Sequence, residues 1–227
     1  MEEFLNKKLL TIFWIVLFVH CVFQFFVLPY RAVTKPMLVP ILLTYLLLKD
    51  ENIGKPIGKS IFYIGLFLAL FGDVLLIIIN DTFFLAGMIA FMLMNIFYSI
   101  SFACLSKPRL KSILSFCLTI LLLTALAIPI FGYLSPKMGD YRMPVMIYQF
   151  TLVLMVAFAV NILGSDRYRK VALRYLVPGA VIFLIENILV AYNLFAWDRN
   201  KDVYIIIMLT YGTAQYLMVR GILKAYL

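Results

Sequence analysis

The stretch SIFYIGLFLALFGDVLLIIIN, residues 60–80, contains a single charged side chain, Asp73. A helix of about 20 mostly apolar residues is long enough to cross the hydrocarbon core of a bilayer. Only helices and closed barrels satisfy their backbone hydrogen bonds there, and no part of the sequence has the alternating pattern of a barrel strand. Residues 60–80 therefore predict a membrane-spanning helix.

The composition of the whole chain agrees with this interpretation. Of its 227 residues, 65% are hydrophobic and 14% are charged, and the mean hydropathy is +1.03. A soluble domain has about a quarter of its residues charged, so this chain lacks the polar side chains to cover a water-facing surface. We predict an all-α, polytopic integral membrane bundle that forms one domain over residues 1–227.

Eight stretches are predicted to span the membrane: residues 9–30, 34–48, 60–80, 83–105, 112–132, 143–164, 171–196 and 203–223. The second has the shortest apolar run, and the orientation of every later span depends on it. The first is expected to be retained, because the bulky Phe25, Phe26 and Tyr30 stand where a signal-peptide cleavage site needs small residues.

The basic residues predict the orientation, because cytoplasmic loops are enriched in Lys and Arg. With both termini in the cytoplasm, 14 of the 20 basic residues lie in inner segments: Lys7, Lys8, Lys49, Lys55, Lys59, Lys107, Arg109, Lys111, Arg167, Arg169, Lys170, Arg174, Arg220 and Lys224. The outer segments hold the other six: Arg31, Lys35, Lys137, Arg142, Arg199 and Lys201. This distribution explains the net charge of +9 without nucleic acid as a partner. We expect a multi-pass protein of a bacterial inner (plasma) membrane.

Two carboxyl side chains, Asp73 and Glu186, lie well inside predicted spans. Each costs on the order of 2.5–3.5 kcal/mol to insert, so it either belongs to a structural pair or marks a functional site, and we favour the site. Asn80 and Asn193 follow the two acids by seven residues, which is two helical turns. Each acid is therefore expected to share a helix face with an Asn further out.

Other polar side chains are predicted to gather at the same depth. Lys35 and Arg31 enter the second span from the outer side, and Asn95 lies in the fourth. A pocket between helices that opens outward would collect these groups. Two further sets follow helical spacing and fit either helix packing or ligand contact: Gly87, Phe91, Asn95, Tyr98 and Phe102 in the fourth span, and Tyr211 and Gln215 in the last.

Several kinds of chemistry find no support in the sequence. The sole histidine, His20, has no Cys or His partners at zinc-site spacing, and we interpret it as a core residue. Cys21, Cys104 and Cys117 lie in or beside apolar runs without paired spacing and are expected to be small core side chains. There is no phosphate-binding loop and no nucleophilic serine motif. We expect no metal and no cofactor.

Short motifs along the chain occur in a recognisable order. They are Thr34–Lys35–Pro36, Leu70–Phe71–Gly72–Asp73, Phe84–Leu85–Ala86–Gly87 with Phe91 and Tyr98, Gly179–Ala180 with Phe183, and Tyr211–Gly212–Thr213–Ala214–Gln215. In this order and spacing the chain resembles the YhhN, or lysoplasmalogenase-like, family of eight-span membrane proteins. The resemblance covers nearly the whole sequence.

The resemblance implies a hydrolase that cleaves the vinyl ether bond of lysoplasmalogens, with a lysophospholipid and membrane lipids as its partners. Asp73 and Glu186 would supply the acid and base, in an order that the residues leave open. Lys35 or Arg31 would attract the substrate phosphate. The full set expected to contact substrate is Lys35, Arg31, Asn95, Tyr98, Asn187, Tyr211 and Gln215.

The sequence departs from the family at two polar positions. Members usually carry Ser–Asp where this chain has Glu186–Asn187, and His where it has Asn95. Two alternatives to a hydrolase follow. One is a transporter of lipid or small solutes that uses the buried acids, and the other is a catalytically silent member that binds lipid.

Overall fold

A computed structural model describes residues 2–48, 56–106 and 110–226 of the chain, with residues 2–7 and 110–112 described for their backbone alone. This part of the chain is helical throughout and contains no strand. Its α-helices are α1 (Glu2–Phe25), α2 (Arg31–Leu48), α3 (Ile57–Leu75), α4 (Asp81–Ala103), α5 (Leu110–Leu134), α6 (Arg142–Asn161), α7 (Arg169–Val171), α8 (Val177–Phe195) and α9 (Lys201–Tyr226).

Eight helical segments of the described residues are long and apolar enough to cross a membrane, which confirms the predicted fold class. Five are single α-helices, and two, Ile113–Lys137 and Gly139–Gly164, extend α5 and α6 by short 3-10 turns. The remaining one runs from Arg169 to Phe195 and joins α7 to α8 through a π-helical turn, Ala172–Leu176. The turn ends two residues before Pro178, which has no N–H to continue a regular ladder.

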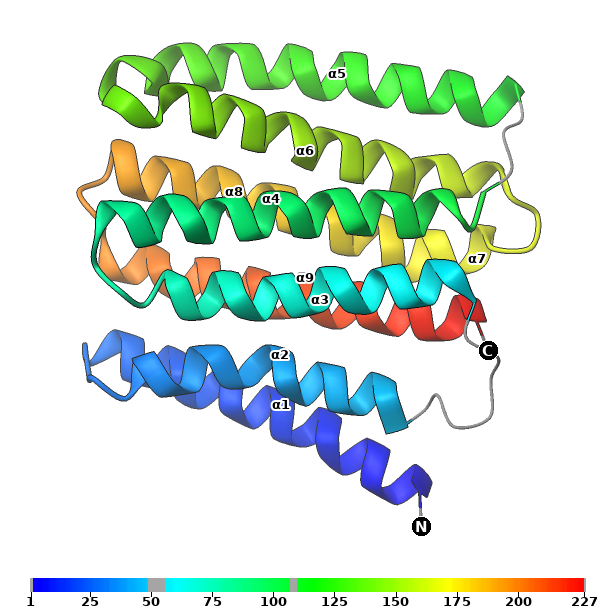
Figure 1. Cartoon of the computed structure of the whole chain (residues 1–227), viewed down its shortest axis with the longest axis horizontal. Coiled ribbons are helices and arrows are strands. Elements are labelled where there is room, and N and C mark those ends of the chain that lie inside the picture. Colours follow the sequence, from blue (N-terminus) through cyan, green and yellow to red (C-terminus); the bar gives the residue numbers. More distant parts are fainter. Residues whose placement is uncertain (1, 49–55, 107–109, 227) are drawn as a thin grey trace.

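The helices run alongside one another, and the two chain ends lie at the same end of the bundle (Figure 1). A chain that crosses the bundle eight times has both of its ends on the same side. This agrees with the charge pattern, which predicts both termini on one side of the membrane. The side of the membrane that this end faces remains a prediction from the basic residues. Four of those residues, Lys49, Lys55, Lys107 and Arg109, lie outside the described part of the chain, as do the side chains of Lys7 and Lys111.

The first and third spans end five residues earlier than predicted. The chain leaves α1 at Phe25 because Val27 adopts a positive φ of 56° and Pro29 follows. α3 ends at Leu75, and Asn80 instead begins α4, where its side chain accepts a hydrogen bond of 2.9 Å from the backbone N–H of Thr82.

The expected alignment of each acid with an Asn is therefore wrong in one of two cases. Asn80 caps α4 and does not share a helix face with Asp73. Asn193 does lie on α8, buried, two turns beyond Glu186. An apolar run alone could not separate the end of α3 from the turn after it, since Leu76 to Ile79 are as hydrophobic as the helix itself.

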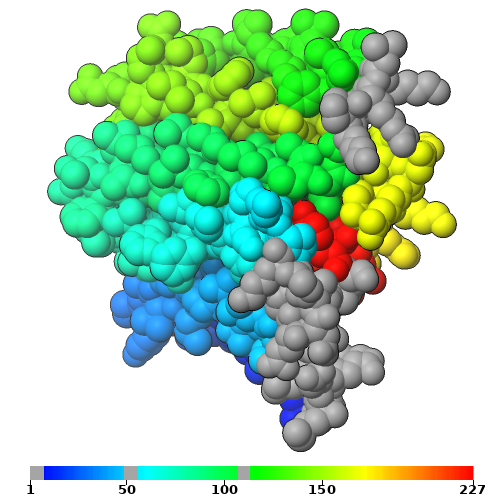
Figure 2. All heavy atoms as spheres, turned by 45° about the vertical axis from the view of Figure 1, so that its right-hand side comes forward, coloured from blue at the N-terminus to red at the C-terminus, as the bar shows by residue number. Residues whose placement is uncertain are grey.

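The helices form a stack with α5 and α6 at one edge and α1 and α2 at the other (Figures 1 and 2). α3, α4, α8 and α9 lie between these edges, and the hydrophobic core extends from them to buried side chains of α1, α2 and α6. α5 packs on α6 at the outside, and of its described side chains from Ile113 onward only the last, Leu134, is buried.

This arrangement corrects the expectation for the cysteines. All three are free, but only Cys21 is buried. Cys104 and Cys117 are exposed, because Cys104 lies just past the end of α4 and Cys117 lies on the peripheral helix α5.

α3 and α4 pack closely because glycine leaves room for aromatic rings. A Cβ at Gly65 would lie 2.7 Å from the ring of Tyr98. That ring cannot move aside, since it stacks on Phe62 with centroids 4.3 Å apart and its hydroxyl donates to Gln215 Oε1 at 2.9 Å. The buried face predicted for the fourth span is confirmed, as all of its five members are buried.

Replacing Gly65 by Ala is expected to destabilise the bundle by about 1–3 kcal/mol, the usual cost of overpacking a tight interior. Gly132, on α5, provides the control, because a Cβ there meets nothing within 4 Å. Gly132→Ala should be neutral or slightly stabilising. Unfolding curves in detergent measure both, and a Gly65→Ala protein as stable as the parent would contradict this packing.

The orientation can be tested directly with two matched cysteines. Each is introduced into a variant that lacks the native Cys21, Cys104 and Cys117. Ser135 and Ser165 are half-buried serines in turns at opposite ends of the bundle. A membrane-impermeant maleimide applied to intact cells is expected to label Ser135→Cys and to label Ser165→Cys only after permeabilisation. The reverse pattern would invert the orientation.

Candidate acid-lined cavity

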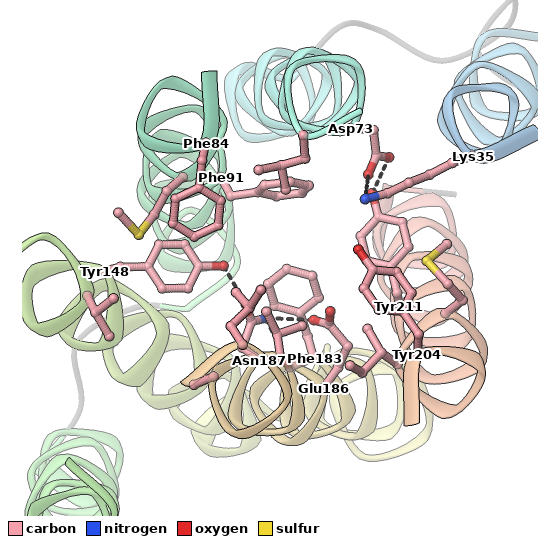
Figure 3. A pocket seen from close by; sticks show the side chains of 18 of the residues that line it. Lys35, Asp73, Phe84, Phe91, Tyr148, Phe183, Glu186, Asn187, Tyr204 and Tyr211 are labelled. Atoms are coloured by element: carbon pink, nitrogen blue, oxygen red, sulfur yellow. Dashed lines mark hydrogen bonds and ion pairs between the residues drawn. The ribbon is translucent and has the colours of Figure 1, made fainter. Parts of the chain in front are cut away.

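A cavity lies among α2, α3, α4, α6, α8 and α9 (Figure 3). The space inside it that water-sized molecules can occupy is about 120 Å³, and its empty volume with the adjoining open space included is about 800 Å³. Its walls are mostly apolar. The lining consists of Lys35, Asp73, Leu76, Phe84, Met88, Phe91, Val145, Tyr148, Phe183, Glu186, Asn187, Val190, Ala191, Leu194, Phe195, Tyr204, Ile207, Met208 and Tyr211.

The cavity occupies the half of the bundle away from the chain ends. Its lining reaches Phe84 near the start of α4 and Phe195 at the end of α8. Glu186 lies nine residues before that end, which is about 14 Å along a helix axis. Along α8, the lining residues Val190 and Leu194 lie between this acid and the end of the helix. The charge pattern assigns this half of the bundle to the outer side.

Three helices meet at Asp73. The hydroxyl of Tyr211, on α9, donates to Asp73 Oδ2 at 2.6 Å, and the ammonium of Lys35, on α2, lies 3.6 Å from Oδ1. The Asp73 side chain is 1% exposed and that of Lys35 14%. A charge so far from water is tolerated when it is paired and hydrogen-bonded, and here both conditions hold.

Glu186 lies on another wall of the cavity and has different interaction partners (Figure 3). Its Oε2 accepts a hydrogen bond of 2.7 Å from the side-chain amide of Asn187. The same amide nitrogen donates to the carbonyl of Phe183 at 2.8 Å, and its oxygen accepts from the hydroxyl of Tyr148 at 2.6 Å. Within the described residues, Glu186 is thus held by a neutral amide, whereas Asp73 is held by a cation.

Five of the nine residues expected at the site line the cavity together: Lys35, Asp73, Glu186, Asn187 and Tyr211. The two acids come from α3 and α8 and are far apart in sequence. The offset of the Glu186–Asn187 pair does not take either side chain off the cavity wall, because adjacent positions on α8 both face the wide gap between α6 and α9.

The other four lie elsewhere. Arg31 is the first residue of α2 and donates to Gln24 on α1 at 3.4 Å. Asn95 is buried against α6, where it donates to Thr151 at 3.4 Å. Tyr98 and Gln215 bond to each other one to two turns closer to the chain ends than the cavity. None of these four residues is among those that line the cavity.

His20 is a buried core residue, as expected, although its Nε2 has no hydrogen-bond partner among the described residues. It is 2% exposed, and its Nδ1 lies 2.8 Å from Thr34 Oγ1, which ties α1 to α2. Among the described residues there is no group of three His, Cys, Asp or Glu side chains that could hold a metal ion.

Sequence reasoning missed two tyrosines of the wall, Tyr148 and Tyr204. Tyr204 had a signal, since it precedes Tyr211 by two helical turns and so shares its face. No signal in the sequence spacing pointed to Tyr148, because its partner, Asn187, is 39 residues away on another helix.

The bundle and its cavity define a class: a polytopic membrane protein with two acids deep in an apolar chamber among its helices. Residues 30–222 match the YhhN family, and the chain belongs to that family. No curated protein and no solved structure matched the chain.

Loss of the Lys35 charge is expected to destabilise the protein. Lys35→Met leaves a buried Asp73 carboxylate without its cation, which costs about 3 kcal/mol. The double variant Lys35→Met/Asp73→Asn should regain most of that loss, because no charge is then left unpaired. Unfolding curves in detergent measure the free energy of unfolding of the parent, the single variant and the double variant.

Lys170→Met, at an exposed lysine of α7, serves as the control and should match the parent. A Lys35→Met protein with parental stability, or a double variant no better than the single one, would contradict the pairing.

Proposed function

We propose that this protein is a membrane hydrolase that opens the vinyl ether bond of a lysoplasmalogen. The observation that carries the proposal is the presence of Asp73 and Glu186 on the walls of one apolar cavity, with unlike partners. Membership of the YhhN family supports a lysoplasmalogenase-like activity.

The reaction needs one proton donor and one anion. A proton is added to the vinyl carbon remote from the ether oxygen, which leaves an oxocarbenium ion. Water adds to this cation, and the resulting hemiacetal separates into a fatty aldehyde and the free hydroxyl of the glycerophospho-headgroup. One water is consumed for each bond broken, and the proton is returned.

The partners of the two acids support one assignment of the roles that the sequence left open. Asp73 is the anion, because Lys35 and Tyr211 both stabilise its charged form. It stabilises the oxocarbenium ion and accepts a proton from the attacking water. Glu186 is the acid, since its partner is a neutral amide and its surroundings are apolar, which favours the protonated carboxyl.

The shape of the cavity suits a single-chain lipid. The apolar side chains of Phe84, Val190 and Leu194 line the same cavity as the acids and would hold an alkenyl chain. Lys35 has ammonium protons beyond the one directed at Asp73, and these would attract the phosphate. Arg31 is not on the wall, so this role falls to Lys35 alone.

The decisive experiment is aldehyde release by purified protein in detergent. The parent is expected to turn over a lysoplasmalogen, and Glu186→Gln and Asp73→Asn should each lower kcat by about 100-fold or more, the usual contribution of a general acid or base. Asp140→Asn, at an exposed acid in the turn between α5 and α6, is the control.

Two results would overturn the proposal. One is an active enzyme that neither substitution at the acids affects. The other is an inactive parent that instead drives proton-coupled uptake of a solute in liposomes, which would favour a transporter. A parent that binds lysolipid without releasing aldehyde would be a lipid-binding member of the family.

A further inference from the structure

The side chain of Asn187 is fixed in one orientation by three hydrogen bonds. The carbonyl of Phe183 can only accept, so the atom 2.8 Å from it must be the amide nitrogen. This nitrogen has two protons, and the second points to Glu186 Oε2 at 2.7 Å. The amide oxygen then faces the Tyr148 hydroxyl, which donates to it at 2.6 Å.

We propose that Tyr148 and Asn187 are positioning residues that hold the Glu186 carboxyl with its proton on Oε1. A protonated carboxyl accepts at its carbonyl oxygen and donates from the other oxygen. Because Oε2 receives the N–H of Asn187, Oε2 is the accepting oxygen, and the acidic proton belongs to Oε1. This inference rests on the proposed function, in which Glu186 is the acid.

Such support is needed because a glutamate side chain is long, and among the described residues only Asn187 forms a hydrogen bond with the Glu186 carboxyl. Proton transfer to carbon depends on the position of the donor, and a displacement of about 1 Å can cost about 100-fold in rate. Asp73 has its own support in Tyr211 and Lys35. Each acid is thus held through a tyrosine, directly for Asp73 and through an amide for Glu186.

The origin of Tyr148 adds a second consequence. It belongs to α6, whereas Glu186 and Asn187 belong to α8 (Figure 3). The hydrogen bond between Tyr148 and Asn187 therefore couples the spacing of these two helices, and so the width of the cavity, to the orientation of the acid.

The first measurement is steady-state kinetics of Tyr148→Phe, Asn187→Leu and the double variant. We expect each single variant to lower kcat by about 10- to 100-fold with KM unchanged. The double variant should be no slower than Asn187→Leu, because both substitutions break one chain of contacts. Tyr133→Phe, at an exposed tyrosine outside the cavity, controls for loss of a hydroxyl.

Losses that multiply in the double variant would overturn the proposal, as would single variants at the parental rate. A change in KM with kcat preserved would assign Tyr148 and Asn187 to substrate binding instead. If the hydrogen bond between Tyr148 and Asn187 only held α6 against α8, the variants would be less stable but would show no specific loss of kcat. Unfolding curves of the same variants distinguish this case.

A second measurement does not depend on turnover. Dicyclohexylcarbodiimide reacts with protonated carboxyls in apolar surroundings, and mass spectrometry of peptides locates the adduct. We expect Glu186 to be labelled in the parent, and labelling to rise by the same factor in Tyr148→Phe and Asn187→Leu, with Asp73 unaffected. Unequal or absent changes would overturn the positioning role. If the parent released no aldehyde, the proposed reaction would fail, and the labelling would still decide this inference.

Discussion

The ion pair between Lys35 and Asp73 is the constraint on which the cavity depends. A carboxylate in the apolar half of a helix bundle is stable only with a partner, and Lys35 brings α2 to α3 to provide one. Tyr211 adds α9 to the same point. α2 has the shortest apolar run of the eight spans and contains Pro36 and Pro40, so its own helical preference is weak. The charge that it delivers near its outer end explains why it packs beside the cavity.

The two acids of the cavity differ in their partners more than in their burial. Asp73 and Glu186 are both buried, yet one faces an ammonium group and the other a neutral amide. In a medium of low dielectric constant, a cation beside a carboxyl favours its charged form, and a neutral amide does so less. Two carboxyls with unlike surroundings are what acid–base chemistry on one bond requires. The unlike partners, rather than the presence of two acids alone, make the cavity a candidate for catalysis.

Hydropathy located all eight spans because the cost of burying polar backbone and side chains leaves few alternatives in a membrane. It placed the ends of α1 and α3 wrongly, since the turn at Val27 and the cap at Asn80 are local features that apolar residues surround. The acids were found because a lone carboxylate in an apolar run is costly. Arg31 and Tyr98 were expected at the site by depth or face, but depth says nothing of which neighbour a side chain meets. Tyr148 was missed because its place in the site depends on a hydrogen bond to Asn187. Sequence spacing cannot show that the helix of Asn187 lies beside that of Tyr148.

The peripheral position of α5 has a mechanical consequence. Its 25 residues extend for about 37 Å, which exceeds the roughly 30 Å of a typical hydrocarbon core. Such a helix relieves the mismatch by tilting. It contributes no residue to the cavity wall, and α6 stands between it and the central helices. A change in the tilt of α5 would therefore not by itself displace any described residue of the cavity wall.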